Sequence, residues 1–247
     1  MKSTVYCNSI ENIFWDTKPV AVLAVTEGID VWRIAVSANA QQLSYFNALL
    51  QPDELNRADR YHQEKDRQRF VISRAILRIL LGKYLGQEPA GIQLITGKNK
   101  KPFVQNAGAI DLHYNTSHSG DWILIAVGNS DIGVDVEKID NTFSYEDVLH
   151  LGFGASEINL IKTSASPREY FYLHWTRKEA LTKASGKGLD DGLISVPCLD
   201  GWHTVDAEIA GDTASWVVSS FKVGTQYIGS VAYDSNEKNI RFREIIV

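Results

Sequence analysis

Residues 132–138 read IGVDVEK, and this alternation of apolar and charged side chains predicts a β-strand. Ile132, Val134 and Val136 would project from one face into a core, which leaves Asp135 and Glu137 side by side on the other face. Two carboxylates held that close repel each other unless one is protonated or a cation lies between them, and Mg²⁺ is suited to that role. Taken alone, the pair fits better with the solvated outer face of an edge strand.

A second stretch, residues 175–189, reads WTRKEALTKASGKGL and predicts the last turns of a helix. Trp175, Glu179 and Lys183 would lie above one another on one helix face, next to Tyr172. An exposed Glu–Lys pair contributes only about a few tenths of a kcal/mol, but a wholly exposed face rarely carries two large aromatic residues. Glu179 with Lys183 and the nearby Lys178 therefore suits a metal-bound phosphate.

Two loops are further candidates for phosphate binding. Residues 115–120 read NTSHSG and offer hydroxyls, an imidazole and turn-forming residues with free backbone N–H groups. Residues 96–102 read TGKNKKP, a glycine followed by basic residues, without the spacing of a Walker A loop. Each has an ordinary alternative, a structural histidine in the first and a solvated turn in the second.

A long helix is predicted over residues 65–85 and another over 168–185, each preceded and followed by strands and each ended by glycine. The repeat of this pattern suggests two similar halves that meet near residues 115–125. In the first helix Arg67, Arg74 and Arg78 share a stripe, while Arg69 lies among apolar residues. An arginine there needs an anion, either a ligand phosphate or an internal carboxylate.

Composition excludes several classes of protein. The 247 residues carry a net charge of −5, so no overall basic excess supports nucleic-acid binding. Two cysteines make neither a disulfide framework nor a four-cysteine zinc site, and we expect a reducing cytoplasm. The apolar runs are too short to span a membrane, and the first residues lack the apolar region of a signal peptide.

In this order and spacing the motifs resemble those of 4′-phosphopantetheinyl transferases of the Sfp-like type, from about Gln51 to Leu189. Residues 133–137 and 175–189 are the specific matches, and residues 115–120 corroborate them. Lys101-Pro102 corresponds to the family's G-K-P motif, with the glycine displaced to Gly97. The adenine side of the site is therefore expected to differ in detail.

The resemblance implies an α+β fold of two similar α+β halves related by a pseudo-twofold axis, with the active site in the cleft between them. We place the halves at residues 1–118 and 119–247. The first half would contribute nucleotide- and phosphate-binding groups, and the second half the metal- and phosphate-binding motifs.

The resemblance also implies roles for individual residues. Mg²⁺ would be held by Asp135, Glu137 and Glu179. Lys183 would act in catalysis with Glu179 and, with Lys178 nearby, would neutralise the phosphates of coenzyme A. The 3′-phosphate and adjacent groups would be bound by Arg57, Arg69, Ser117 and His118, and the adenine would be lined by Lys101, Pro102 and Thr116.

The implied reaction moves the 4′-phosphopantetheine arm of coenzyme A to a serine of an apo acyl or peptidyl carrier protein and releases adenosine 3′,5′-bisphosphate. The base is Glu179 or a water bound to the metal, and we expect a monomer. One alternative is a non-catalytic module that binds coenzyme A or carrier proteins. Another is a different coenzyme A or nucleotide enzyme, such as an acyltransferase. The sequence does not identify the carrier protein.

Overall fold

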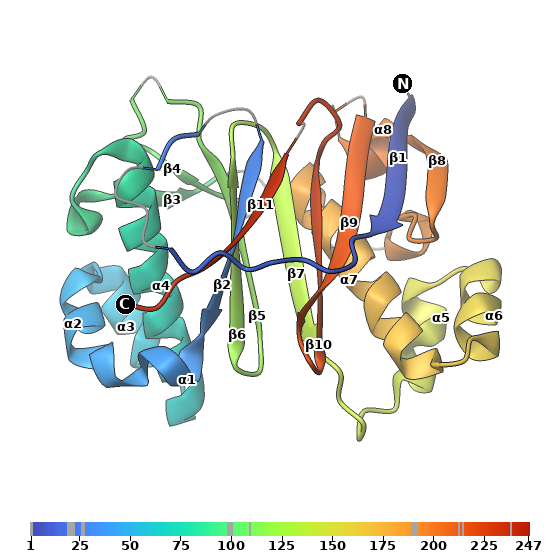
Figure 1. The fold of residues 1–247 in the computed structure, drawn as a ribbon, viewed down its shortest axis with the longest axis horizontal. Helices are drawn as coiled ribbons and strands as arrows, with labels where there is room; N and C mark the ends of the chain where they lie inside the picture. Colours follow the sequence, from blue (N-terminus) through green and yellow to red (C-terminus); the bar gives the residue numbers. More distant parts are fainter. Residues whose placement is uncertain are drawn as a thin grey trace.

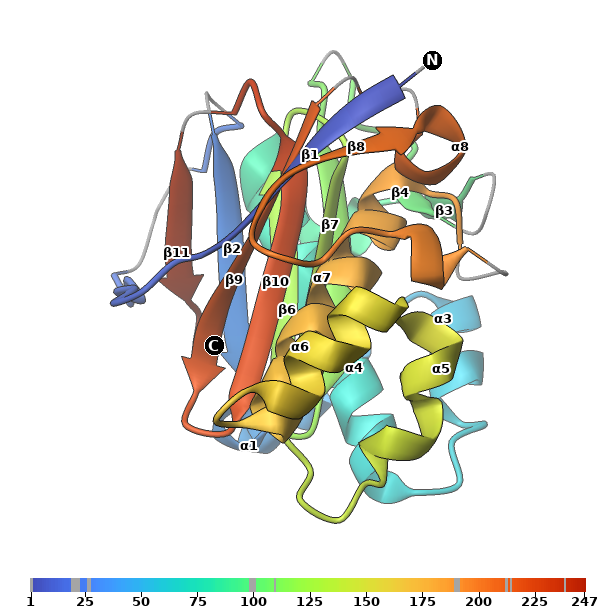
Figure 2. The ribbon, with the colours of Figure 1, turned by 90° about the vertical axis from the view of Figure 1, so that its right-hand side faces the viewer.

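Two sheets stand side by side through the middle of the molecule, and the long helices pack behind them (Figures 1 and 2). The computed structural model describes residues 2–18, 23–25, 28–97, 101–108, 110–188, 192–211, 213, 215–237 and 239–247. The first sheet has the strand order β11-β2-β6-β5 and the second β7-β10-β9-β1-β8, while β3 and β4 form a small separate sheet. The predicted α+β class is confirmed.

The elements up to the junction of the sheets are β1 (Lys2–Ser9), β2 (Ile29–Ala35), α1 (Val36–Asn39), η1 (Ala40–Gln42), α2 (Leu43–Leu49), α3 (Pro52–Ala58), α4 (Glu64–Leu85), η2 (Pro89–Gly91), β3 (Leu94–Thr96), β4 (Pro102–Val104), β5 (His113–Ser119) and β6 (Trp122–Gly128). The remaining elements are β7 (Ile132–Lys138), η4 (Tyr145–Val148), α5 (Leu149–Gly152), α6 (Ala155–Thr163), α7 (Pro167–Ser185), η5 (Leu193–Ser195), β8 (Gly201–Asp206), α8 (Ala207–Ala210), β9 (Ser215–Gly224), β10 (Tyr227–Asp234) and β11 (Ile240–Glu244).

Each half of the molecule packs one long helix against one sheet. Helix α4 contributes a run of buried aliphatic residues to the core it shares with β2 and β6, and α7 packs on β7 and β10. Both helices end as the sequence predicts, at a glycine in the left-handed conformation: Gly86 with φ 63° and Gly186 with φ 67°. The expected pair of similar halves is therefore confirmed.

The ends of the chain cross from one half to the other. Strand β1 pairs with β8 and β9 of the second sheet, and the segment after it runs across both sheets toward β11, which pairs with β2 of the first sheet (Figure 1). The expected division at residue 118 falls inside the β5–β6 hairpin, since both strands belong to the first sheet. The sheets therefore do not follow the division into residues 1–118 and 119–247.

The two sheets are joined along β5 and β7, which we call the seam. Side chains at alternate positions of β5 (Asn115, Ser117 and Ser119) accept hydrogen bonds, at 3.0, 3.3 and 3.0 Å, from the backbone N–H groups of Val134, Val136 and Lys138. Alternate residues of a strand share a face, so the side chains on one face of β5 accept hydrogen bonds from the N–H groups along the edge of β7. These N–H groups would otherwise be unpaired. The seam sets the first half against the strand that carries Asp135 and Glu137.

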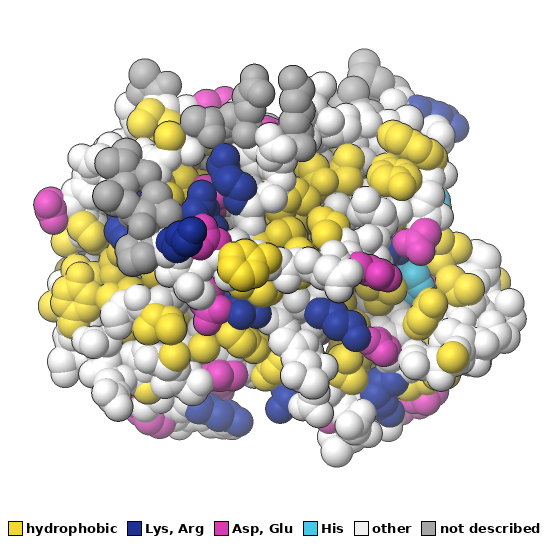
Figure 3. Space-filling model, in the orientation of Figure 1, with side chains coloured by type: hydrophobic (Ala, Val, Ile, Leu, Met, Phe, Trp, Pro, Cys, Tyr) yellow, Lys and Arg dark blue, Asp and Glu magenta, His cyan; other side chains and the backbone are white. Residues whose placement is uncertain are grey.

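Charges are mixed on the face that the N-terminal segment crosses. Figure 3 shows lysines and arginines interspersed with acidic residues and with scattered hydrophobic side chains on this side of the molecule. The interspersed signs make this face unlike the uniformly basic surfaces that track nucleic-acid backbones. In the part of the chain that the structure describes, no helix has the length and apolar character needed to cross a membrane.

Candidate functional site

Asp135, Glu137, Glu179 and Lys183 lie where α7 packs on β7, near enough for their charges to interact, and we call them the acid cluster. The Asp135 side chain is 5% exposed, and the Lys183 Nζ lies 2.7 Å from its Oδ1. In the described part of the chain, Lys183 forms its ion pair with Asp135 on β7 and not with Glu179 on its own helix. The alternatives of a solvated strand face and of an exposed helix pair are therefore both wrong here.

The close approach of α7 to β7 depends on Gly133. A Cβ atom at this position would lie 2.1 Å from the carbonyl oxygen of Ala180 and 2.3 Å from the backbone nitrogen of Ala184. Small residues on both elements thus bring helix and strand backbones together. Since Glu179 adjoins Ala180 and Lys183 adjoins Ala184, this contact also brings the charged ends of the helix residues to Asp135.

Gly133→Ala is expected to destabilise the protein and to separate the acid cluster. The added methyl group meets backbone atoms, which cannot turn away, so the helix must move from the strand. We expect a loss of about 3 kcal/mol of unfolding free energy and a fall of roughly 6–12 °C in melting temperature, measured by thermal unfolding. The control is Gly91→Ala, where an added Cβ meets nothing within 4 Å, and equal melting temperatures of the two variants would contradict this account.

The acid cluster carries more negative charge than its lysine offsets. Burial, followed by the charge of Asp135, raises the pKa of Glu137 and of Glu179 to about 7. With all three carboxylates ionised, one ammonium leaves a net charge of −2, which one divalent cation would neutralise. The Oδ2 atom of Asp135 is buried and has no hydrogen-bond partner.

The donor types and the charge of the cluster fit a hard cation such as Mg²⁺, which prefers carboxylate oxygens. Within the described ranges, however, no three acidic, histidine or cysteine side chains are gathered into a set that could hold a metal ion. In this conformation Lys183 occupies the position beside Asp135. The lysine therefore has to share or yield the carboxylate when a cation binds.

The seam supplies hydroxyl groups to the cluster. Ser117 Oγ donates a hydrogen bond of 2.8 Å to Asp135, and Ser119 Oγ donates one of 2.8 Å to Glu137. Ser119 was not among the expected site residues, although its spacing from Ser117 matches that of Glu137 from Asp135. Gly120 closes the motif with φ 54°, against the Tyr227 hydroxyl that accepts the Asp121 N–H.

His118 and Arg69 lie on the first-half side of the cluster. Loss of hydration lowers the pKa of His118, and the positive charges of Arg69 and Lys183 lower it further. The Arg69 Nη2 is paired with Asp66 at 2.7 Å, and its side chain is 22% exposed. Of the expected phosphate contacts, Arg69 and Lys183 both act electrostatically on His118. Arg69 is already paired with an internal carboxylate, that of Asp66.

A cavity of about 430 Å³ lies beside Lys101 and Pro102 and is also lined by Phe103, Tyr114 and Asp131. The Lys101 ammonium is held by two hydrogen bonds, which it donates to Asp131 at 2.5 Å and to the carbonyl oxygen of Ala184 at 2.8 Å. Thr116 lies on β5 but outside the lining of this cavity. Lys98, Asn99 and Lys100 of the same loop lie outside the described residues.

The other arginines of the first half have different surroundings. Arg57 is exposed on α3, with its guanidinium 5.2 Å from the centre of the Phe70 ring. Arg78 is buried and donates to Glu54 at 2.8 Å, and Arg74 lies 3.7 Å from the same carboxylate. Glu54 is therefore the internal anion for Arg74 and Arg78, as Asp66 is for Arg69.

The expected place of Lys178 near the phosphates is corrected by the structure. Its ammonium is fully buried, 2.9 Å from Glu157 and within 3.1 Å of the carbonyls of Leu193 and Val196. One residue along a helix turns the side chain by about 100°, so Lys178 faces α6 and η5 while Glu179 faces β7. A buried cation with these partners cannot reach a ligand in the cluster.

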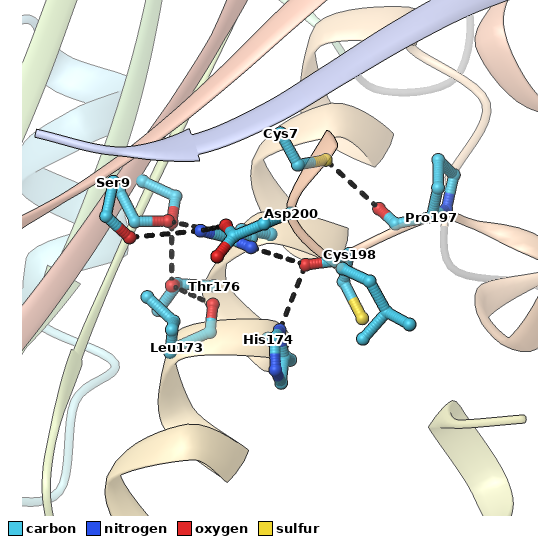
Figure 4. A network of polar contacts seen from close by, with 12 residues as sticks. Cys7, Ser9, Leu173, His174, Thr176, Pro197, Cys198 and Asp200 are labelled. Atoms are coloured by element: carbon cyan, nitrogen blue, oxygen red, sulfur yellow. Dashed lines mark hydrogen bonds and ion pairs between the residues drawn. The ribbon is translucent and has the colours of Figure 1, made fainter. Parts of the chain in front are cut away.

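Arg177 plays a similar part on the neighbouring side of α7. Its guanidinium is buried and donates to Ser220, Ser9, Asp200 and the carbonyl of Cys198, which His174 also contacts (Figure 4). These contacts tie α7 to β1, β9 and the loop before β8. Arg177 and Lys178 thus fix the helix within the second half, and Glu179 and Lys183 are presented on a rigid element.

Known proteins with similar sequences point to one family. The chain matches the family model of the 4′-phosphopantetheinyl transferase N-terminal domain over residues 35–130 and that of the 4′-phosphopantetheinyl transferase superfamily over residues 131–232. It is 34% identical to the 4′-phosphopantetheinyl transferase HetI of Nostoc, over 71% of this chain and 76% of HetI. It is 28% identical to the transferase Sfp of Bacillus subtilis, over 58% of this chain and 63% of Sfp.

Proposed function

Because the chain belongs to the 4′-phosphopantetheinyl transferase superfamily, we propose that it moves the 4′-phosphopantetheine arm of coenzyme A to a serine of an apo acyl or peptidyl carrier protein. In this proposal the reaction depends on Mg²⁺ and releases adenosine 3′,5′-bisphosphate. The observation that carries it is the acid cluster at the seam, where Lys183 is paired with Asp135 and β5 donates hydroxyl groups to Asp135 and Glu137.

Asp135, Glu137 and Glu179 would hold the Mg²⁺. When bound, the cation would offset the charge of the pyrophosphate and stabilise the leaving phosphate. The support for this assignment is the net charge of the cluster and the unpartnered oxygen of Asp135. Lys183, released from Asp135, would turn its ammonium toward the same phosphates.

The bound nucleotide would extend from the acid cluster toward Lys101. Asp131, which lines the cavity beside Lys101, immediately precedes β7, and Asp135 lies on that strand four residues later, roughly 13 Å along an extended chain. Pro102 would line the adenine there, while Ser117, His118, Arg57 and Arg69 would contact the 3′-phosphate side. Thr116 remains a proposed adenine contact on β5.

A base must take the proton of the carrier serine, and we propose Glu179 for this step. In the absence of a cation, burial and then the charge of Asp135 raise its pKa to about 7, so this carboxylate is a better proton acceptor than an exposed one. Glu179 is 8% exposed as a residue and belongs to α7, which packs on β7. The serine oxygen would attack the phosphorus that carries the pantetheine arm while the bond from that phosphorus to the bridging oxygen of the pyrophosphate breaks. Adenosine 3′,5′-bisphosphate then leaves, and no covalent enzyme intermediate is needed.

The family membership makes the chain an enzyme of this type, which disfavours the alternatives of a non-catalytic binding module and of an acyltransferase. We further propose that it works as a monomer in the cytoplasm. One chain contributes every residue of the candidate site, and both cysteines are free and buried. A reducing compartment suits such cysteines.

The Arg69→Ala variant tests the nucleotide side of the site. A charged hydrogen bond contributes about 1.5–3 kcal/mol, so if Arg69 binds the 3′-phosphate, the preference for coenzyme A over 3′-dephospho-coenzyme A should shrink by roughly ten- to a hundredfold. The measurement is the ratio of the two kcat/KM values in wild type and variant. An unchanged ratio would leave Arg69 as the internal partner of Asp66 only.

The function itself is tested by mass spectrometry on purified apo carrier proteins from fatty acid, polyketide and nonribosomal peptide synthases. Each is incubated with the enzyme, coenzyme A and Mg²⁺. A mass gain of one phosphopantetheine group on the carrier serine is expected for at least one carrier and should disappear with EDTA. No gain on any carrier, with coenzyme A still bound, would favour the binding module.

A further inference from the structure

Ser119 lies where the seam meets the acid cluster, and its hydroxyl has a defined orientation. The oxygen accepts a hydrogen bond of 3.0 Å from the N–H of Lys138 and donates one of 2.8 Å to Glu137 Oε2. A hydroxyl has one proton to donate. Because the backbone N–H occupies the acceptor side, the proton is directed at the Glu137 carboxylate.

The two neighbours of Ser119 on the same face of β5 provide an internal comparison. Ser117 repeats the arrangement one step along, since it accepts from the Val136 N–H and donates to Asp135. Asn115 makes only the hydrogen bond to the β7 backbone, since its side-chain oxygen accepts from the Val134 N–H at 3.0 Å. The bridge between the strands and the contact with a carboxylate are therefore separable functions of this face.

We infer that Ser119, on the first sheet, is a positioning residue, whose hydroxyl holds the Glu137 carboxylate on the side of β7 that carries Asp135 and so strengthens divalent-cation binding. The inference rests on the proposed function, in which Glu137 is a ligand of the cation. The Glu137 carboxylate lies at the end of a side chain with several rotatable bonds, on β7, the edge strand of its sheet. The hydrogen bond from Ser119 already fixes this side chain, so cation binding costs less of its conformational entropy.

The contact between Ser119 and Glu137 crosses the seam from β5 to β7. The contact cannot form unless β5 lies beside β7, and it is made only when the two halves are joined as in this structure. The cation site then depends on residues of both halves, although all three of its carboxylates belong to the second.

The test is the affinity for Mn²⁺, which suits the same oxygen donors as Mg²⁺, measured by the electron paramagnetic resonance signal of free Mn²⁺ in the presence of saturating coenzyme A. Ser119→Ala should bind Mn²⁺ about tenfold more weakly than wild type, in the range typical of groups that orient metal ligands. Ser119→Thr keeps the hydroxyl and should stay close to wild type. In kinetics, Ser119→Ala should need about tenfold more Mg²⁺ for half-maximal rate, and added Mg²⁺ should restore most of the rate.

The matched control is Asn115→Ala, which removes a bridge of the seam without touching a carboxylate. It should lower the melting temperature and leave the Mn²⁺ affinity near wild type. Equal Mn²⁺ affinity of wild type and Ser119→Ala would overturn the inference while leaving the proposed function intact. A Ser119→Thr variant as weak as Ser119→Ala would overturn it too, even if Asn115→Ala failed to fold. No Mn²⁺ binding by wild type would overturn the proposed cation site and this inference together.

Discussion

Asp135→Asn is expected to lower the rate of phosphopantetheine transfer by about a thousandfold or more. Asp135 is the centre of the acid cluster, since Lys183 and Ser117 both bind its carboxylate and its charge raises the pKa of Glu137 and Glu179. Asparagine keeps the volume but removes the charge that a cation needs. The measurement is the single-turnover rate with coenzyme A and an apo carrier at saturating Mg²⁺.

The fold should survive this change. Lys183 is 29% exposed and can turn its ammonium into water when its partner is lost, and the repulsion among the three carboxylates is relieved. The control is Asp206→Asn, an exposed aspartate at the end of β8, which should keep the wild-type rate. A near-normal rate for Asp135→Asn at saturating Mg²⁺ would contradict the role of this carboxylate in cation binding.

Lys178→Met is expected to lower the unfolding free energy by about 3–5 kcal/mol, the cost of breaking a buried ion pair on one side. Glu157 is 8% exposed and would keep its charge without a cation, and the carbonyls of Leu193 and Val196 would lose their donor. Urea unfolding measures the loss. The coenzyme A dissociation constant of the folded variant should stay at the wild-type value.

Lys183→Met is expected to have the opposite effect on coenzyme A binding. It should weaken coenzyme A binding and slow turnover together, because this lysine would contact phosphate in the ground state and the transition state. Its unfolding free energy should fall as well, because Asp135 is only 5% exposed and loses its cation beside two further carboxylates, so coenzyme A binding and not stability separates the two variants. Weak coenzyme A binding with normal stability in Lys178→Met would mean that Lys178, and not Lys183, faces the ligand.

The local pattern of the sequence was sufficient for the elements that carry the site. Glycine marked the ends of α4 and α7, and the alternation in residues 132–138 placed Asp135 and Glu137 opposite a buried face of Val134 and Val136. These predictions depend on residues close together in the chain, where helix and strand periods determine which side chains share a face.

What the sequence did not predict depends on contacts between distant residues. Strand β1 belongs to the second sheet because Thr4 pairs with Ser215, and no local pattern in residues 2–9 indicates that partner. Lys178 is adjacent in sequence to Glu179 but is buried against Glu157, 21 residues earlier on α6. Proximity in sequence was therefore a poor guide to which lysine faces the ligand.

Ser119 is an intermediate case. Its two-residue spacing from Ser117 repeats that of Glu137 from Asp135, so the periods of the two strands were available to predict a matched pair of contacts. What was missing was the pairing of β5 with β7, which is made by side chains and not by a regular ladder. Such a junction has no signature in strand propensity alone.

The most direct test of the account is a crystal structure of the protein with coenzyme A and Mn²⁺, read from the anomalous signal of the metal. The account predicts one Mn²⁺ site, with carboxylate oxygens of Asp135, Glu137 and Glu179 at about 2.0–2.2 Å and the pyrophosphate on its open side. Lys183 should have left Asp135 for the phosphates. A metal bound elsewhere, or coenzyme A bound away from the seam, would contradict the account.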